Sequence, residues 1–148
     1  YGKIVVWSPK PNIPNIRGLL SSSDNMSQHI AIANSRLSPY GLAASQIINN
    51  LNLSDHLAEK LVSGENISQT FQWVHSGNAE LGFIAYSQIN NPRLASQGSY
   101  WMPPQSLYSP IDQQAVLLKD NEAAREFKSF IKSSDARKVM QHYGYDLP

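Results

Sequence analysis

The chain has 148 residues, a formal net charge of +1 at pH 7 and no cysteine, a length that suits one domain, or one domain and part of another. The lack of cysteine excludes disulfides, thiolate metal sites and cysteine nucleophiles, and the near-neutral charge gives no electrostatic case for nucleic-acid binding. Its apolar runs are far shorter than the roughly 18 residues of a membrane span, and no basic segment precedes an apolar run as in a signal peptide, so we expect soluble material that is processed or excised from a longer chain.

Short β-branched or apolar runs alternate with stretches of helical spacing along the chain. In chain order we expect strand Lys3–Ser8, helix Ile16–Ser22, turn Ser21–Ser27, strand His29–Ala33, helix Ser38–Asn50, strand Lys60–Ser63, helix Asn66–Ser76, strand Leu81–Tyr86, a short helix from Ser87, strand Ser99–Met102, strand Gln114–Leu118, helix Asn121–Ser133 and helix Ser134–Gly144. The short connections and the alternation of strands with helices predict an α/β fold, in which helices cover both faces of a mainly parallel sheet.

Two of the expected helix starts follow directly after a strand. Ser38 is a candidate N-cap with Pro39 in the first turn, and Asn66 lies three residues before Gln69, a pattern related to a capping box. Gly77 is placed to end the second of these helices. The first turn of a helix carries unpaired N–H groups and a partial positive charge, so either start could bind an anion at the carboxyl edge of the sheet. The residues alone leave open whether capping side chains satisfy these groups instead.

The sequence offers little for catalysis or metal binding. It contains no Gly-x-Ser-x-Gly nucleophile motif and no glycine-rich phosphate loop, and Glu65 and Glu80 are acid–base candidates only by elimination. No histidine pairs with another at i, i+4 spacing or lies beside a plausible carboxylate pair. The four histidines are His29, His56, His75 and His142. We therefore expect no metal site and no enzymatic activity.

Four blocks of the chain resemble the periplasmic molybdate-binding proteins of ABC importers. These blocks are IAIANSRLSPYGLAA (30–44), KLVSGENISQTFQWVHSGNAELGFIAYSQI (60–89), YSPIDQQAVLLK (108–119) and SSDARKVMQHYGYDL (133–147). The resemblance implies the type II periplasmic-binding-protein fold, in which two α/β lobes close on an oxyanion. The expected fold class is a three-layer α/β/α lobe with a mainly parallel sheet, plus C-terminal helices of the other lobe.

The resemblance also implies a division of the chain. Residues 1–11 would be a hinge strand, residues 12–105 a complete second lobe, and residues 106–148 a return hinge strand with the C-terminal helices of an incomplete first lobe. The N-terminal part of the family's first lobe, with two serine-containing turns that bind the oxyanion, has no counterpart here. The C-terminal helices would then expose apolar faces, so we expect self-association, including a dimer that exchanges C-terminal elements.

The implied function is the substrate-binding component of an ABC importer. It would bind molybdate, and tungstate as well, and deliver the anion to a membrane permease from the periplasm or from an anchored position at the cell surface. Family members use no cofactor and no metal, because backbone N–H groups and hydroxyls hold the oxyanion. Neutral, preorganised dipoles can hold a buried dianion without burying a cation, which would itself lose solvation.

Two ligand positions of the family map onto Tyr40 and Ile67. At both, the backbone N–H would donate to the oxyanion, and the Tyr40 hydroxyl could donate as well. Some members have a small residue at the position of Tyr40 and supply a phenol from the strand position of Ala85, so this chain has the reverse pair. Adjacency alone adds three possible neighbours to this site, which are Gly41, Asn66 and Ser68.

Two other classes of function remain open from the sequence. The effector-sensing domain of a transcription regulator shares the two-lobe fold, and a helix-turn-helix encoded before Tyr1 would favour it, whereas a signal peptide and a first lobe would favour transport. An enzyme acting on an oxyanion ester is the third class. The lack of a base–nucleophile pair near the two helix starts argues against that enzyme.

Overall fold

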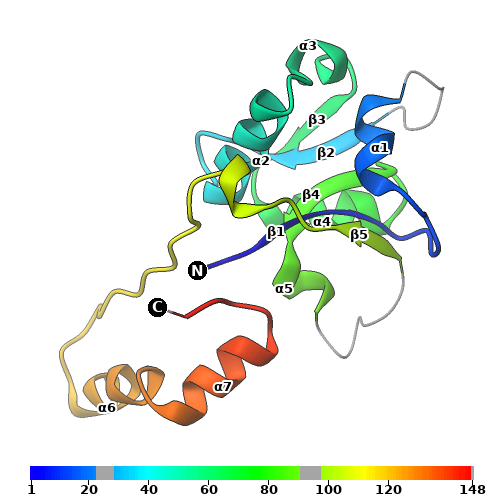
Figure 1. Cartoon of the computed structure of the whole chain (residues 1–148). Coiled ribbons are helices and arrows are strands. Elements are labelled where there is room, and N and C mark those ends of the chain that lie inside the picture. The colour runs from blue at the N-terminus through cyan, green and yellow to red at the C-terminus, as the bar shows by residue number, and fades with distance from the viewer. Residues whose placement is uncertain (23–28, 91–97, 148) are drawn as a thin grey trace.

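A five-stranded sheet forms the centre of the computed structural model, which describes residues 1–22, 29–90 and 98–147 (Figure 1). The strand order is β3-β2-β4-β1-β5. β2 is parallel to β3 and β4, whereas β1 is antiparallel to both β4 and β5. Four of the five strands therefore point the same way, which confirms the mainly parallel sheet. The strands are β1 (Ile4–Ser8), β2 (Ile30–Ala33), β3 (Leu61–Gly64), β4 (Leu81–Ala85) and β5 (Ser99–Trp101).

Helices cover both faces of this sheet, as Figure 1 shows. They are α1 (Ile16–Ser21), α2 (Pro39–Asn50), α3 (Ser54–Leu57), α4 (Ile67–His75), α5 (Tyr86–Ile89), the 3-10 turn η1 (Gln105–Leu107), α6 (Glu122–Ile131) and α7 (Ser134–His142). Buried residues of α1, α2 and α3 pack on one face, and Val74 of α4 packs on the other. The expected three-layer α/β/α arrangement is confirmed.

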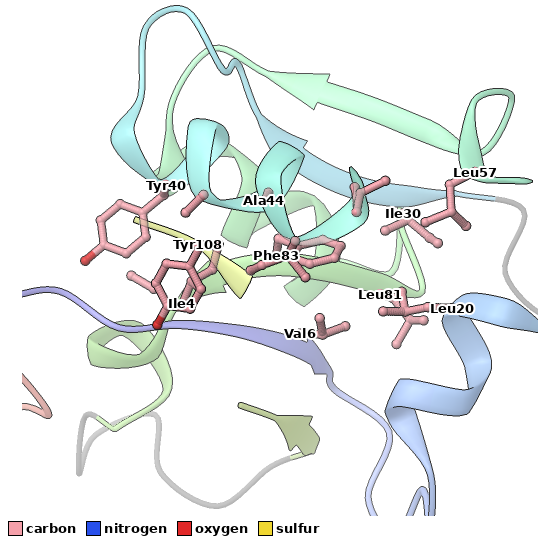
Figure 2. Packing of buried hydrophobic residues seen from close by; sticks show 14 of the residues in the cluster. Ile4, Val6, Leu20, Ile30, Tyr40, Ala44, Leu57, Leu81, Phe83 and Tyr108 are labelled. Carbon is pink, nitrogen blue, oxygen red and sulfur yellow. The ribbon is translucent and has the colours of Figure 1, made fainter. Parts of the chain in front are cut away.

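The strand β1 is fully buried and contributes side chains to two hydrophobic clusters, one on each face of the sheet. Side chains alternate between the faces of a strand, so Ile4 and Val6 join the cluster beneath α2, while Val5 and Trp7 join the cluster beneath α4. Figure 2 shows Ile4 and Val6 beside Phe83 and Tyr108 in the first cluster. Each buried aliphatic side chain contributes about 1.5–3 kcal/mol by its removal from water, so the two-sided burial makes β1 central to stability.

One predicted strand is wrong, and two short elements were not expected. Residues 114–118 form no strand, since Val116 and Leu118 are 80% and 89% exposed. The contact with the N-terminal segment comes before these residues instead, as an isolated antiparallel bridge between Gly2 and Ile111. The short helix α3 and the turn η1 were not predicted. Most of the predicted turn Ser21–Ser27 lies outside the described residues.

Residues 112–147, here called the C-terminal arm, extend from the sheet body (Figure 1). Its helices α6 and α7 contact each other, and Ala136 is their one buried residue. Phe127 and Phe130 are 63% and 54% exposed, as expected for apolar faces without a partner. The end of the arm returns to the body, where the Asn90 side chain donates to the His142 carbonyl at 2.7 Å and Lys3 pairs with Asp146 at 2.7 Å. Within the described ranges, no helix has the length and apolar character for a membrane crossing.

Candidate functional site

The carboxyl ends of β2, β3 and β4 lie at one edge of the sheet, and the helices α2, α4 and α5 begin there. The connection after β2 leads to β3 on one side, whereas the connection after β4 leads to β5 on the other. The direction of the connections thus reverses between the adjacent strands β2 and β4. In open α/β sheets, ligands bind in the crevice at such a reversal, which makes this edge the candidate site.

The start of α2 is left without a side-chain cap. The Asn34 carbonyl accepts hydrogen bonds from the N–H groups of Leu37 and Ser38 at 3.2 Å and 2.9 Å, which turns the chain into the helix. Ser38 occupies the predicted N-cap position with Pro39 after it, but its hydroxyl makes no capping hydrogen bond. The Tyr40 N–H has no acceptor in the described part of the chain. This helix start therefore offers a free donor at the sheet edge.

Gly41 lets the start of α2 pack directly on the end of β2. A Cβ at this position would lie 2.3 Å from the Ala33 carbonyl oxygen and 2.7 Å from the carbonyl carbon and oxygen of Asn34. These atoms belong to the backbone, so they cannot move aside as the tip of a side chain can. Glycine is thus the residue that lets the free N–H groups of α2 lie this close to the strand.

The Tyr40 ring lies inside the core at this edge. It is 7% exposed and belongs to the same cluster as Tyr108, beside which Figure 2 shows it. Its hydroxyl is next to Gly2, because a Cβ built on Gly2 would lie 2.3 Å from the phenol oxygen. Burial, with a smaller contribution from Tyr145 and Tyr108, raises the pKa of Tyr40 well above its ordinary value. The phenol therefore stays neutral.

The start of α4 is capped, in contrast with α2. The Asn66 Oδ1 atom accepts from the Gln69 N–H at 2.9 Å, and the Gln69 Oε1 atom accepts from the Glu65 N–H at 2.7 Å. The predicted relation between Asn66 and Gln69 is confirmed, with the return bond reaching Glu65 one residue earlier than in a capping box. Among the described residues, no acceptor pairs with the Ile67 N–H. The cap takes up the Gln69 N–H and leaves the Ile67 N–H available.

Gln88 joins two of the predicted site residues, and the sequence reasoning missed it. Its Oε1 atom accepts from the Ala85 N–H at 3.0 Å, and its Nε2 atom donates to the Ile67 carbonyl at 3.2 Å. The position of a glutamine three residues after Ala85, at the start of a short helix, is the local signal that could have suggested a capping role. The bond to Ile67 spans 21 residues of sequence and has no such signal.

The structure brings the main predicted residues to one place. Tyr40 and Ala85 are buried in the same apolar cluster, and Ile67 packs against it. Gly41 is buried, whereas Asn66 and Ser68 are exposed beside Ile67. Because the N–H groups of Tyr40 and Ile67 belong to helix starts, the site presents donors and the partial positive charge of two helix N-termini. In the described ranges, no group of three or more His, Cys, Asp or Glu could hold a metal ion.

Comparisons with known proteins identify the family and the fold of the chain. Residues 1–146 match the family described as bacterial extracellular solute-binding protein. The chain is 42% identical to the molybdate-binding protein ModA of Azotobacter vinelandii over 99% of its own length and 59% of that relative. It is 40% identical to ModA of Rhodobacter capsulatus over 97% of its own length and 56% of that relative. The chain thus spans less than three fifths of the length of these two relatives.

A solved structure agrees with the sequence comparison. The periplasmic molybdate-binding protein of Azotobacter vinelandii superposes with a TM-score of 0.90 at 38% identity, covering 99% of this chain and 65% of that one. The match confirms the periplasmic-binding-protein fold. None of these matches supports the alternative of an effector-sensing domain of a transcription regulator. This chain belongs to the bacterial extracellular solute-binding protein family.

Proposed function

We propose that this chain is part of the substrate-binding component of an ABC importer that binds molybdate in the periplasm and delivers it to a membrane permease without catalysing a reaction. Tungstate, an oxyanion of the same shape and charge, is a second ligand of the same site. The observation that carries the proposal is the pair of free N–H donors of Tyr40 and Ile67, at helix starts that share one sheet edge. Identities of 40% and 42% to molybdate-binding proteins support the choice of anion.

The chain supplies one side of the binding site in this proposal. Residues 12–105 are one lobe, and residues 1–11 and 106–148 are hinge segments followed by helices of a second lobe. The limited contact between the C-terminal arm and the sheet body supports a second lobe for α6 and α7, as does the greater length of the relatives. The hinge segment of residues 1–11 is joined to the lobe of residues 12–105, because β1 pairs with β4 and β5. The remaining donors would come from the second lobe.

Backbone donors suit a small dianion for a physical reason. Hydrogen bonds to charged groups contribute about 1.5–3 kcal/mol each, and the helix N-termini add favourable electrostatic energy. Donors held by α2 and α4 cannot follow a smaller anion, so sulfate would leave hydrogen bonds unmade and bind more weakly. The close approach of α2 to β2 at Gly41 provides this rigidity on one side.

The replacement Ile67→Pro tests the proposal directly. Proline removes the N–H while it fits the first position of a helix, and Asn66 already has the extended backbone, with φ −148° and ψ 171°, that a residue before proline needs. The control Ile67→Ala keeps the N–H and shortens the side chain. In a ¹⁵N NMR titration with sodium molybdate, we expect the Tyr40 amide signal to move in wild type and in Ile67→Ala, with at least tenfold weaker binding in Ile67→Pro. Equal affinities for the two variants would refute the role of Ile67.

A further inference from the structure

The side chain of Gln88 links the two segments that flank the candidate site. Its two amide atoms bond to the backbone of different elements, the end of β4 at Ala85 and the first residue of α4 at Ile67. A glutamine is long enough to span this gap, and it offers an acceptor and a donor at once. The Ile67 carbonyl shares its peptide plane with the Ser68 N–H, so the bond from Gln88 fixes that peptide group. The same bond restricts the first turn of α4, which carries the Ile67 N–H at its start.

We propose that Gln88 is a positioning residue for oxyanion binding, which holds the first turn of α4 so that the Ile67 N–H points to the anion. This inference rests on the proposed function, because it assigns a role to that N–H. The same amide ties Ala85, the residue at the facing strand end, to Ile67. Gln88 therefore fixes the distance between the end of β4 and the start of α4.

The neutral charge of the amide is part of the role. A carboxylate in this position could still accept from the Ala85 N–H, but it could not donate to the Ile67 carbonyl. It would also place a negative charge near the anion, which lowers affinity. A thioether of similar length would lose both hydrogen bonds without adding charge. The variants Gln88→Glu and Gln88→Met thus separate the hydrogen bonds from the charge.

Gln46, six residues after Tyr40 in α2, provides a matched control. Its Oε1 atom accepts from the Ser109 N–H at 2.9 Å and its Nε2 atom donates to the Ser109 hydroxyl at 3.2 Å. Like Gln88, it uses both amide atoms to join distant segments, and both of these hydrogen bonds go to Ser109, which is not a predicted site residue. Gln46→Met therefore reproduces the loss of two hydrogen bonds without touching Ile67.

The experiment combines urea denaturation with ¹⁵N NMR of the free chain and a titration with sodium molybdate. We expect stability to fall in the order wild type, Gln88→Glu, Gln88→Met, because the carboxylate keeps the bond to Ala85. Affinity should fall in a different order, wild type, Gln88→Met, Gln88→Glu, with a loss of about tenfold for Gln88→Met. Gln46→Met should lose stability while it keeps wild-type affinity. A role limited to stability would leave the affinity of Gln88→Met at the wild-type value.

The free-protein spectra distinguish failure of this inference from failure of the proposed function. In Gln88→Met, the Ile67 and Ser68 amide signals should shift and hydrogen exchange of the Ala85 amide should accelerate, while Gln46→Met leaves both unchanged. Unchanged signals and exchange in Gln88→Met would overturn the positioning role, as would wild-type affinity in both Gln88 variants. If molybdate did not shift the Tyr40 and Ile67 amide signals of the wild-type chain, the proposed function would be overturned. The role of Gln88 in anion binding would then be overturned as well.

Discussion

Replacing Gly41 by alanine sets two physical effects against each other. Alanine favours a helix over glycine by about 1 kcal/mol, so propensity alone predicts a more stable protein. The structure predicts the opposite, because the new Cβ would lie 2.3 Å from the Ala33 carbonyl oxygen, where ordinary contacts begin at 3.4 Å. The start of α2 would have to move by about 1 Å from β2. Overpacking of this kind destabilises by about 1–3 kcal/mol.

Because the contact is with backbone atoms, we take the upper end of this range, about 3 kcal/mol. After the propensity gain of about 1 kcal/mol, we expect Gly41→Ala to lower the free energy of unfolding by about 2 kcal/mol. Urea denaturation followed by tryptophan fluorescence measures this change, and a slope of about 2 kcal/mol/M converts it to a midpoint lower by about 1 M. Since the displaced helix start carries the Tyr40 N–H, the variant should also lose its response to molybdate in the NMR titration.

Gly18 offers a control at the equivalent position of α1, the third residue of the helix. A Cβ there would meet the Asn15 side chain, whose amide nitrogen lies 2.3 Å away and can rotate aside. Loss of the Asn15 cap, about 1 kcal/mol, would offset the gain in helix propensity, so Gly18→Ala should change stability little. If Gly41→Ala were as stable as wild type, the argument from the close backbone contact would be refuted.

Three further predictions concern the core, the cap of α4 and the arm. Burial raises the pKa of Tyr40, so above pH about 10 the unfolded chain loses a proton that the folded chain keeps, and stability falls. Urea denaturation should show a shallower fall for Tyr40→Phe. Asn66→Ala removes a capping bond and should cost about 1 kcal/mol in the same assay, whereas Asn121→Ala, which removes the same bond from the arm, should leave the main transition unchanged. Phe127 and Phe130 are exposed, so we expect the wild-type chain to self-associate and its molar mass in light scattering to rise with concentration. The variant with serine at both positions should stay monomeric. A wild-type monomer at all concentrations would contradict this prediction.

Local patterns were sufficient for most of the sheet body. The strand at Ile4–Ser8 is a run of apolar and β-branched residues. Such a run predicts a strand that is buried on both faces, and this prediction needs no information from distant parts of the chain. The expected strand at residues 114–118 failed because a strand also needs a neighbour, and Val116 and Leu118 face solvent without one. Composition could not show this, since hydrogen-bond partners in a sheet lie far away in sequence.

The site shows the same limit at the level of single side chains. The relation of Asn66 to Gln69 spans three residues and was predictable. Ser38 has the right residue type for a cap, yet its hydroxyl does not bond to the helix, which only the conformation of the turn reveals. Gln88 was missed because its bond to Ile67 depends on how α4 and β4 pack. The roles of Tyr40 and Ile67 in anion binding remain predictions.

The position of β1 has a consequence for how the protein folds. This strand comes first in the chain but lies between β4 and β5, and its register pairs Val5 with Ile84 and Trp7 with Tyr100. The chain must therefore close a loop of about 80 residues before β1 pairs with β4 in this sheet, which favours slow folding. The β2-α2-β3-α4-β4 unit can assemble earlier from nearer contacts. During synthesis from the N-terminus, β1 would wait unpaired, an apolar strand dependent on residues that emerge much later.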